Sequence, residues 1–118
     1  MTENEISTSI IDCAMRVHTE LGPGLLESVY ETCLLHELTK RGLLAERQKQ
    51  LPINYDGVII DSGLRLDLLV ERQIILELKS VDYLIPVHQA QILTYMKLAK
   101  KELGYLINFN EKLLRNGV

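Results

Sequence analysis

Apolar residues recur every three or four positions in the first part of the chain, and this spacing predicts two helices. The first is expected over residues 5–20. Its apolar side is Ile6, Ile10, Cys13, Ala14, Val17 and, just beyond the helix, Leu21. Gly22-Pro23-Gly24 ends this helix, because proline lacks an amide hydrogen and glycine tolerates positive φ. The second helix is expected from about Leu25 to Arg41, with Gly42 just past its end. Its buried side is expected to be Leu26, Val29, Tyr30, Cys33, Leu34 and Leu38.

The middle of the chain changes to the alternating pattern of β-strands. Three strands are predicted: residues 48–55; residues 58–61 and 64–70 as one strand interrupted or bent near Ser62-Gly63; and residues 73–79. Asp56-Gly57 is a strong hairpin-turn pair, and Glu71-Arg72 supplies the second turn. Because such short turns join the strands, we expect an antiparallel meander.

The helical period returns after Pro86. A helix is expected over residues 87–101, with a broad apolar side made by Val87, Ala90, Leu93, Thr94 and Leu98. Gly104 breaks this pattern, and Tyr105–Phe109 is short and apolar enough for a buried strand. A helix between two strands of one sheet favours a parallel return. The expected fold class is therefore α/β, a mixed four-stranded sheet flanked by helices.

The composition is that of a soluble globular domain. The 118 residues, 47% hydrophobic and 25% charged, suit a single domain over 1–118. No apolar run approaches the roughly 20 residues that cross a bilayer, and Met1–Glu5 lacks the basic and apolar parts of a secretory signal. We therefore expect a cytoplasmic protein with no membrane partner. Cys13 and Cys33 are expected to be reduced thiols packed as small hydrophobic residues; the alternative is a disulfide or a metal-ligand pair.

Three charged residues interrupt the predicted strands and are the main candidates for chemistry. Asp67 begins one apolar run, and Glu77 and Lys79 interrupt another. A buried carboxylate is unfavourable unless it is paired or binds a metal. Alternation puts Glu77 and Lys79 on one face, and counting back from the turn places Asp67 opposite Glu77. The two carboxylates, with a backbone carbonyl such as that of Leu78, suit a hard cation like Mg²⁺. Lys79 beside the cation could orient or deprotonate a water.

Each of these patterns also has an ordinary structural explanation. Lys79 and one carboxylate could form a structural ion pair. Glu27 lies in the first turn of the second predicted helix, where the helix dipole favours an acid. Gln91 and Tyr95, four residues apart, share a helix face that could be solvated surface. His18 is expected to pack or to hydrogen-bond the following turn rather than to bind a ligand.

Together these residues resemble a known family. Gly24-x-x-Glu27-x-x-Tyr30 is the signature of the GxxExxY proteins, a small bacterial and archaeal family placed in the PD-(D/E)XK nuclease superfamily. The similarity continues through residues 65–71, 76–80, 89–95 and 106–110, nearly the whole chain. It implies a restriction-endonuclease-like core. It also implies roles: metal-binding acids Asp67 and Glu77, catalytic lysine Lys79, additional helix acid Glu27, and Gln91 and Tyr95 as the Q-x-x-x-Y element of the RecB-like branch.

The expected function is a Mg²⁺- or Mn²⁺-dependent nuclease acting on nucleic acid, with DNA as the expected substrate. Asp67, Glu77 and the Leu78 carbonyl would hold one metal, and Glu27 would complete its shell or support a second metal. Substrate phosphates would contact the metal and four basic side chains, those of Arg65, Lys97, Lys100 and Lys101. A net charge of −3 predicts weak binding to nucleic acid without a partner. A homodimer and a protein partner that supplies substrate binding are both compatible with this.

Two alternatives to the nuclease remain open at this point. One is a non-catalytic module that keeps the fold and binds nucleic acid or protein. The other is an ion-pair network that binds no metal.

Overall fold

The computed structural model describes all 118 residues, Met1–Val118. The elements in chain order are α1 (Glu3–Leu21), α2 (Glu27–Lys40), β1 (Ala45–Tyr55), β2 (Val58–Val70), β3 (Ile74–Lys79), α3 (Pro86–Ala99), β4 (Leu103–Asn108) and the short 3-10 helix η1 (Leu114–Gly117). Each predicted helix and strand is present, and only η1 was not foreseen. Thr2 begins α1 by a reciprocal cap with Glu5.

The four strands form one mixed sheet in the order β1-β2-β3-β4. β1 and β2 pair antiparallel, as do β2 and β3, whereas β4 returns parallel to β3 after α3. The α/β class and the mixed four-stranded sheet predicted from the sequence are therefore confirmed. β2 is continuous, and the bend expected near Ser62-Gly63 appears as a register shift between Leu51 and Ile53 of β1. A Cβ at Gly63 would lie 2.8 Å from the Ile53 side chain, so glycine permits this close crossing.

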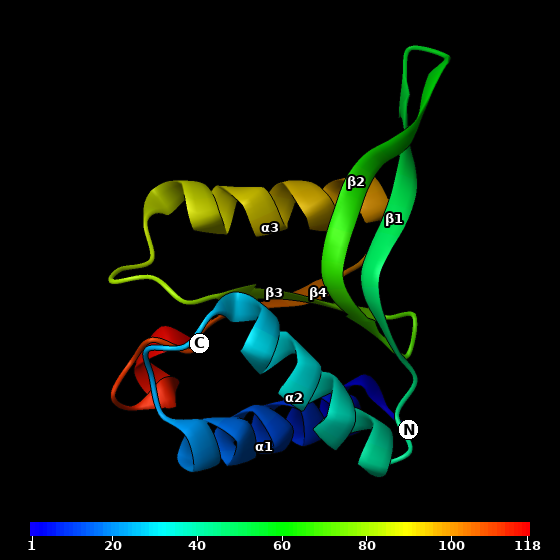
Figure 1. The fold of residues 1–118 in the computed structure, drawn as a ribbon. Helices are drawn as coiled ribbons and strands as arrows, with labels where there is room; N and C mark the ends of the chain where they lie inside the picture. The colour runs from blue at the N-terminus through cyan, green and yellow to red at the C-terminus, as the bar shows by residue number, and fades with distance from the viewer.

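The sheet separates two layers of helices. Figure 1 shows α1 and α2 on one side of the sheet and α3 on the other, with the β1–β2 hairpin rising past α3. The larger core lies between the sheet and α1 and α2, and includes Ile10, Leu34, Leu68 and Leu76. The smaller core, on the α3 side, comprises Leu64, Leu66, Leu69, Ile75 and Ile92. Burial of each such side chain stabilises the fold by roughly 1.5–3 kcal/mol.

The apolar side predicted for α3 is wrong. Ile92 is buried against the sheet, with Tyr95, Met96 and Ala99 beside it. The residues expected to be buried are exposed: Val87, Ala90, Leu93, Thr94 and Leu98. The reason is that α3 is apolar on two sides, and spacing alone does not say which side meets the sheet.

Gly104 is a second correction, because it lies inside β4 instead of ending a pattern before it. A Cβ there would stand 3.1 Å from Ile92 Cδ1 and 3.2 Å from Met96 Sδ. The absent side chain therefore lets α3 approach the strand closely. On the other helix layer, Leu26 and Val29 were expected to be buried but are exposed at the start of α2.

The cysteines and the hydropathy of the helices agree with the sequence analysis. Cys13 is buried in the larger core, Cys33 packs at its edge, and both are free thiols. Burial raises the pKa of the Cys13 thiol. None of the helices is long and apolar enough to cross a membrane.

Candidate active site

Two carboxylates meet where the pairing of β2 with β3 stops. The antiparallel ladder ends at Leu68 opposite Leu76, and Asp67 and Glu77 are the next residues on the two strands. Beyond this point, backbone N–H groups bond to carboxylate side chains on the neighbouring strand instead of to its backbone carbonyls. The Asp67 N–H donates to Glu77 Oε2 (2.9 Å), and the Leu78 N–H donates to Asp67 Oδ2 (2.8 Å). Glu77 is 4% exposed and Asp67 is partly buried. The fold thus brings the two predicted acids together and fixes one oxygen of each.

The backbone is irregular at this point. Leu66 belongs to the smaller core and Leu68 to the larger one, although residues two apart in a regular strand share a face. Across from Asp67 on β1, Gln48 is skipped in the pairing and has a φ of +50°. A non-glycine residue in that region is strained by about 1–3 kcal/mol, and such strain gathers at functional sites. Because β2 changes face here, Asp67 lies in neither core and its carboxylate faces the end of β3.

Lys79 ends β3 and is linked to α3. Its Nζ donates to Gln91 Oε1 (3.3 Å), and Gln91 Nε2 donates to the Tyr95 hydroxyl (3.0 Å). The predicted Q-x-x-x-Y pair therefore lies beside the lysine, partly buried, and is not a solvated surface. None of the ion pairs in the structure includes Lys79. The structure therefore contains no ion pair between Lys79 and either carboxylate, which was the alternative considered from the sequence.

The turn before α2 is held by the tyrosine of the glycine–glutamate–tyrosine signature. Gly22 and Gly24 have φ values of +69° and +98°, which glycine adopts without strain. The buried Tyr30 stacks on Phe109, with ring centroids 4.6 Å apart. Its hydroxyl donates to the Gly22 carbonyl (2.6 Å) and accepts from the Leu25 N–H (3.1 Å). The ring and its hydroxyl together fix the course of the turn.

The same turn is tied to the end of β3, which brings Glu27 toward the carboxylates. Ser80, the residue after Lys79, donates from Oγ to the Leu25 carbonyl (2.5 Å). Glu27 follows as the first residue of α2 and remains exposed. The signature therefore works by fixing the backbone of the turn. As a result, Glu27 faces the cleft from the start of α2.

Glu31 is a buried acid that the sequence analysis missed. It lies one helical turn after Glu27, is 6% exposed, and accepts from Arg47 (2.7 Å) and from Gln48 Nε2 (2.5 Å). Burial is the main cause that raises the pKa values of Asp67 and Glu77, and the nearby charge of Glu31 adds to both rises. The four-residue spacing from Glu27 was the available signal, because it puts both acids on one face of α2.

A polar cleft of about 500 Å³ joins these side chains. It is lined by Glu27, Gln50, Ser62, Gly63, Arg65, Asp67, Glu77, Lys79, Gln91 and Tyr95. Six of these ten residues were predicted as site residues, and a seventh, Arg65, was predicted as a phosphate contact. Gln50 and Ser62, which hydrogen-bond each other (3.3 Å), and Gly63 were not foreseen. They come from the β1–β2 hairpin, so only the register of that hairpin brings them to the cleft.

The electrostatics of the cleft favour a bound proton or cation. Burial, and then the charge of Asp67, raise the pKa of Glu77 from 4.5 to about 7. Burial also raises the pKa of Asp67, against the effect of the Leu78 N–H bond. Two neighbouring carboxylates repel each other when both are ionised, and this repulsion disappears when a cation binds between them.

The donor chemistry of the cleft fits a hard divalent cation. Asp67 and Glu77 offer carboxylate oxygens, and Mg²⁺ is commonly held by one or two carboxylates together with waters and substrate phosphates. No cluster of three or more His, Cys, Asp or Glu side chains could enclose a metal by itself. Glu27 thus lines the same cleft without completing a three-acid cluster, and its role as a ligand stays a prediction.

The remaining predicted residues lie as follows. Leu78 is buried in the larger core, and its N–H donates to Asp67 Oδ2. His18 contacts the carbonyl of Glu111 through Nε2 (2.6 Å), so it holds the C-terminal segment instead of the glycine turn. Three of the predicted phosphate contacts do not line the cleft: Lys97, Lys100 and Lys101. They are at and beyond the end of α3.

Comparison with known proteins gives one match. The family model described as the PD-(D/E)XK nuclease superfamily matches residues 4–118, which include all of the fold except the first residue of α1. No curated protein and no solved structure matches the chain.

Proposed function

Because the chain belongs to the PD-(D/E)XK nuclease superfamily, we propose that it is a metal-dependent nuclease that hydrolyses phosphodiester bonds in nucleic acid. The observation that carries this proposal is the convergence of Asp67, Glu77 and Lys79 in one polar cleft. The two acids come from neighbouring strands, each with one oxygen fixed by a backbone N–H. The lysine stands at the end of the same strand as Glu77.

Asp67 and Glu77 would hold the metal, which we take to be Mg²⁺ or Mn²⁺. The Leu78 carbonyl and Glu27 are the further oxygen donors that we assign to it. Nucleases of this superfamily generally use divalent ions. A divalent ion at such a site polarises the scissile phosphate and lowers the pKa of a bound water. The reciprocal N–H bonds keep both carboxylates aimed at the cleft, so little reorganisation is needed when the site fills.

Lys79 would position the attacking water by donating a hydrogen bond to it from the ammonium group, or would activate that water as the neutral amine. Gln91 restrains the ammonium group through its Oε1, and Tyr95 fixes the orientation of the Gln91 amide. Arg65 lines the cleft in no ion pair. Its guanidinium is therefore available to a phosphate of the substrate, a pairing that arginine makes through two parallel hydrogen bonds.

Two features support the GxxExxY family and the RecB-like branch within the superfamily. The Gly24, Glu27 and Tyr30 signature has a coherent structural purpose, because it holds the helix acid at the cleft. The Gln91–Tyr95 pair contacts the proposed catalytic lysine. We propose DNA as the substrate, and a net charge of −3 means that binding should be weak and salt-sensitive.

The test is a cleavage assay on labelled single- and double-stranded DNA and RNA with Mg²⁺ or Mn²⁺. An Asp67→Asn, Glu77→Gln double variant keeps the shape of both side chains and should lose metal-dependent cleavage. Lys79→Ala should lose roughly a hundredfold or more in rate. Glu20→Gln and Lys112→Ala, on the surface away from the cleft, are the matched controls and should cleave normally.

The assay also separates the nuclease from its alternative. No cleavage of any substrate by folded wild-type protein that binds metal would overturn the nuclease proposal. It would favour a non-catalytic binding module. Undiminished cleavage by Lys79→Ala would remove that residue from the mechanism while leaving the nuclease proposal in place.

A further inference from the structure

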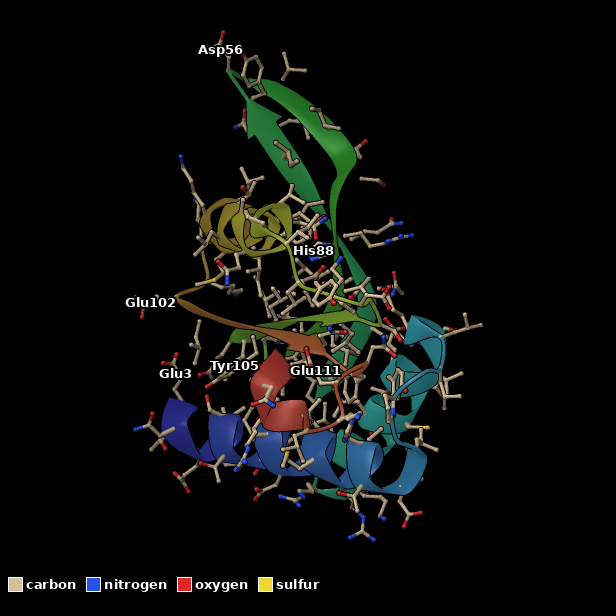
Figure 2. The ribbon with its side chains drawn as sticks, turned by 90° about the vertical axis from the view of Figure 1, so that its left-hand side faces the viewer. Glu3, Asp56, His88, Glu102, Tyr105 and Glu111 are labelled. Carbon is tan, nitrogen blue, oxygen red and sulfur yellow. The ribbon has the colours of Figure 1, made fainter.

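The tip of the β1–β2 hairpin projects from the body of the protein. We call residues 53–60 the arm. Figure 1 shows the arm rising beyond α3, and Figure 2 shows Asp56 at its free end, where no other element packs. Exposure increases along the arm from Ile60 (47%) to Val58 (60%) and Tyr55 (73%). An arm of this kind bears apolar side chains that this chain alone does not cover.

One face of the arm continues the smaller core. Ile53 packs against that core on the α3 side of the sheet. Ile60 is its partner across the strands, and Tyr55 and Val58 are the next pair on the same face. The apolar sheet face that α3 covers near the body of the protein therefore continues along the arm, past the point where α3 covers it. The natural cover for such a surface is another apolar helix.

α3 presents a second apolar side to solvent. We call the residues Val87, Ala90, Leu93, Thr94 and Leu98 the outer face of α3. Leu93 is 62% exposed and Val87 is 61% exposed. A helix that is apolar on both sides is typical of an element buried from both sides. Within one chain only the inner side is covered, by the sheet.

The charges beside the two surfaces are complementary. Asp56 lies on the arm and Asp61 directly follows it, and both are exposed, whereas Lys97 and Lys100 lie exposed at the end of α3. None of these four residues takes part in an ion pair within the chain. An acidic arm from one molecule and a basic helix end from another would therefore attract each other.

We propose that a second copy of this chain docks here, with the arm of each copy lying on the outer face of α3 of the other. Each chain carries both halves of the contact, an uncovered apolar sheet face and an uncovered apolar helix, with opposite charges beside them. A two-fold symmetric dimer satisfies both halves at once, since the same contact is made twice. The interface lies outside the cleft residues, so it does not depend on the proposed nuclease activity.

The test is the mass of the 118-residue protein in solution, measured by sedimentation equilibrium over a concentration series. The wild type should be a dimer. Leu93→Lys and Val58→Lys change exposed residues and should raise the dissociation constant by roughly tenfold or more. Leu113→Lys changes another exposed leucine (52%), which lies beside α1 and on neither surface; this variant is the control and should leave the dissociation constant unchanged. Circular dichroism checks that each variant is folded.

A charge reversal identifies the partner as a second copy. Lys97→Glu should weaken the dimer, and adding Asp61→Lys to the same chain should restore it. A wild type that stays monomeric at all concentrations overturns the proposal and leaves the two surfaces to a different protein. A dimer that is insensitive to Leu93→Lys and Val58→Lys overturns it equally, because the contact would then lie elsewhere.

Discussion

At the scale of single residues, the cleft depends on two carboxylates that take over from a backbone ladder. Asp67 and Glu77 each accept an N–H from the opposite strand at the position where regular pairing stops. The hydrogen bonds hold the carboxylates in place, but burial disfavours their charged forms. The folded protein without metal therefore binds a proton at Glu77 more tightly than the unfolded chain does.

This predicts how the stability of the metal-free protein changes with pH. The folded pKa of Glu77, about 7, lies above its ordinary value of 4.5. Its contribution to stability is therefore complete below pH 4.5 and is lost as the pH rises through 7. The loss reaches about 3 kcal/mol at most. Urea unfolding at several pH values in the presence of a chelator measures it.

The control for this effect is Glu77→Gln, which cannot ionise. Other groups titrate in both proteins, so the difference between their unfolding free energies isolates Glu77. The variant should lose less stability than the wild type between pH 5 and pH 8. Parallel curves for the two proteins would show that Glu77 is not the group responsible.

At the scale of elements, the segment from Gly22 to Tyr30 shows how a short motif can position an acid, Glu27, at the cleft. Tyr30 is fixed by its stack on Phe109, and its hydroxyl holds the turn by two hydrogen bonds. Ser80 fastens the same turn to the end of β3. The position of Glu27 relative to Lys79 is therefore set by backbone contacts between two elements.

The substitution Tyr30→Phe tests how much the two hydrogen bonds of the Tyr30 hydroxyl contribute to the stability of the turn. The variant keeps the ring stack but removes both hydrogen bonds, which should reduce the free energy of unfolding by about 1–3 kcal/mol. Hydrogen exchange at the Leu25 amide should become faster, because that N–H loses its acceptor. Tyr83→Phe, at an exposed position with no hydrogen bond, is the matched control. Unchanged Leu25 exchange in Tyr30→Phe would contradict the assigned role.

At the scale of the whole molecule, the cleft unites residues from α2, the β1–β2 hairpin, β3 and α3. Its two acids repel each other in the folded state, and the unfolded chain has no such preformed pair. A cation that binds there stabilises only the folded protein, so metal binding and global stability are linked.

Mg²⁺ or Mn²⁺ should therefore raise the Tm of the wild type. A concentration one hundred times the dissociation constant adds about 2.7 kcal/mol, or roughly 10 °C for a domain of this size. The Asp67→Asn, Glu77→Gln variant should show no such shift in differential scanning calorimetry. An equal shift in both proteins would mean that the metal binds elsewhere.

The sequence by itself determined the elements, their order and the identity of the main acids and the lysine. Each of these depends on local information: hydrophobic period, turn residues such as Asp56-Gly57, and charges inside apolar runs. Because the turn after β2 is short, counting from it was enough to place Asp67 opposite Glu77. Gln91 and Tyr95 were singled out by the similarity to a known family, and in the structure Lys79 donates to Gln91, which donates to Tyr95.

Only the tertiary structure decided which side of α3 is buried, that Glu31 is buried, and that Gln50 and Ser62 lie at the cleft. α3 has two apolar sides, and the choice between them depends on the close approach that Gly104 allows. Glu31 is buried because Arg47 and Gln48 reach it from a strand 16 and 17 residues away. Gln50 and Ser62 depend on the register of a bulged hairpin. Contacts between distant segments set these outcomes. The spacing of Glu31 from Glu27 placed both acids on one face of α2, but it did not reveal the partners that bury Glu31.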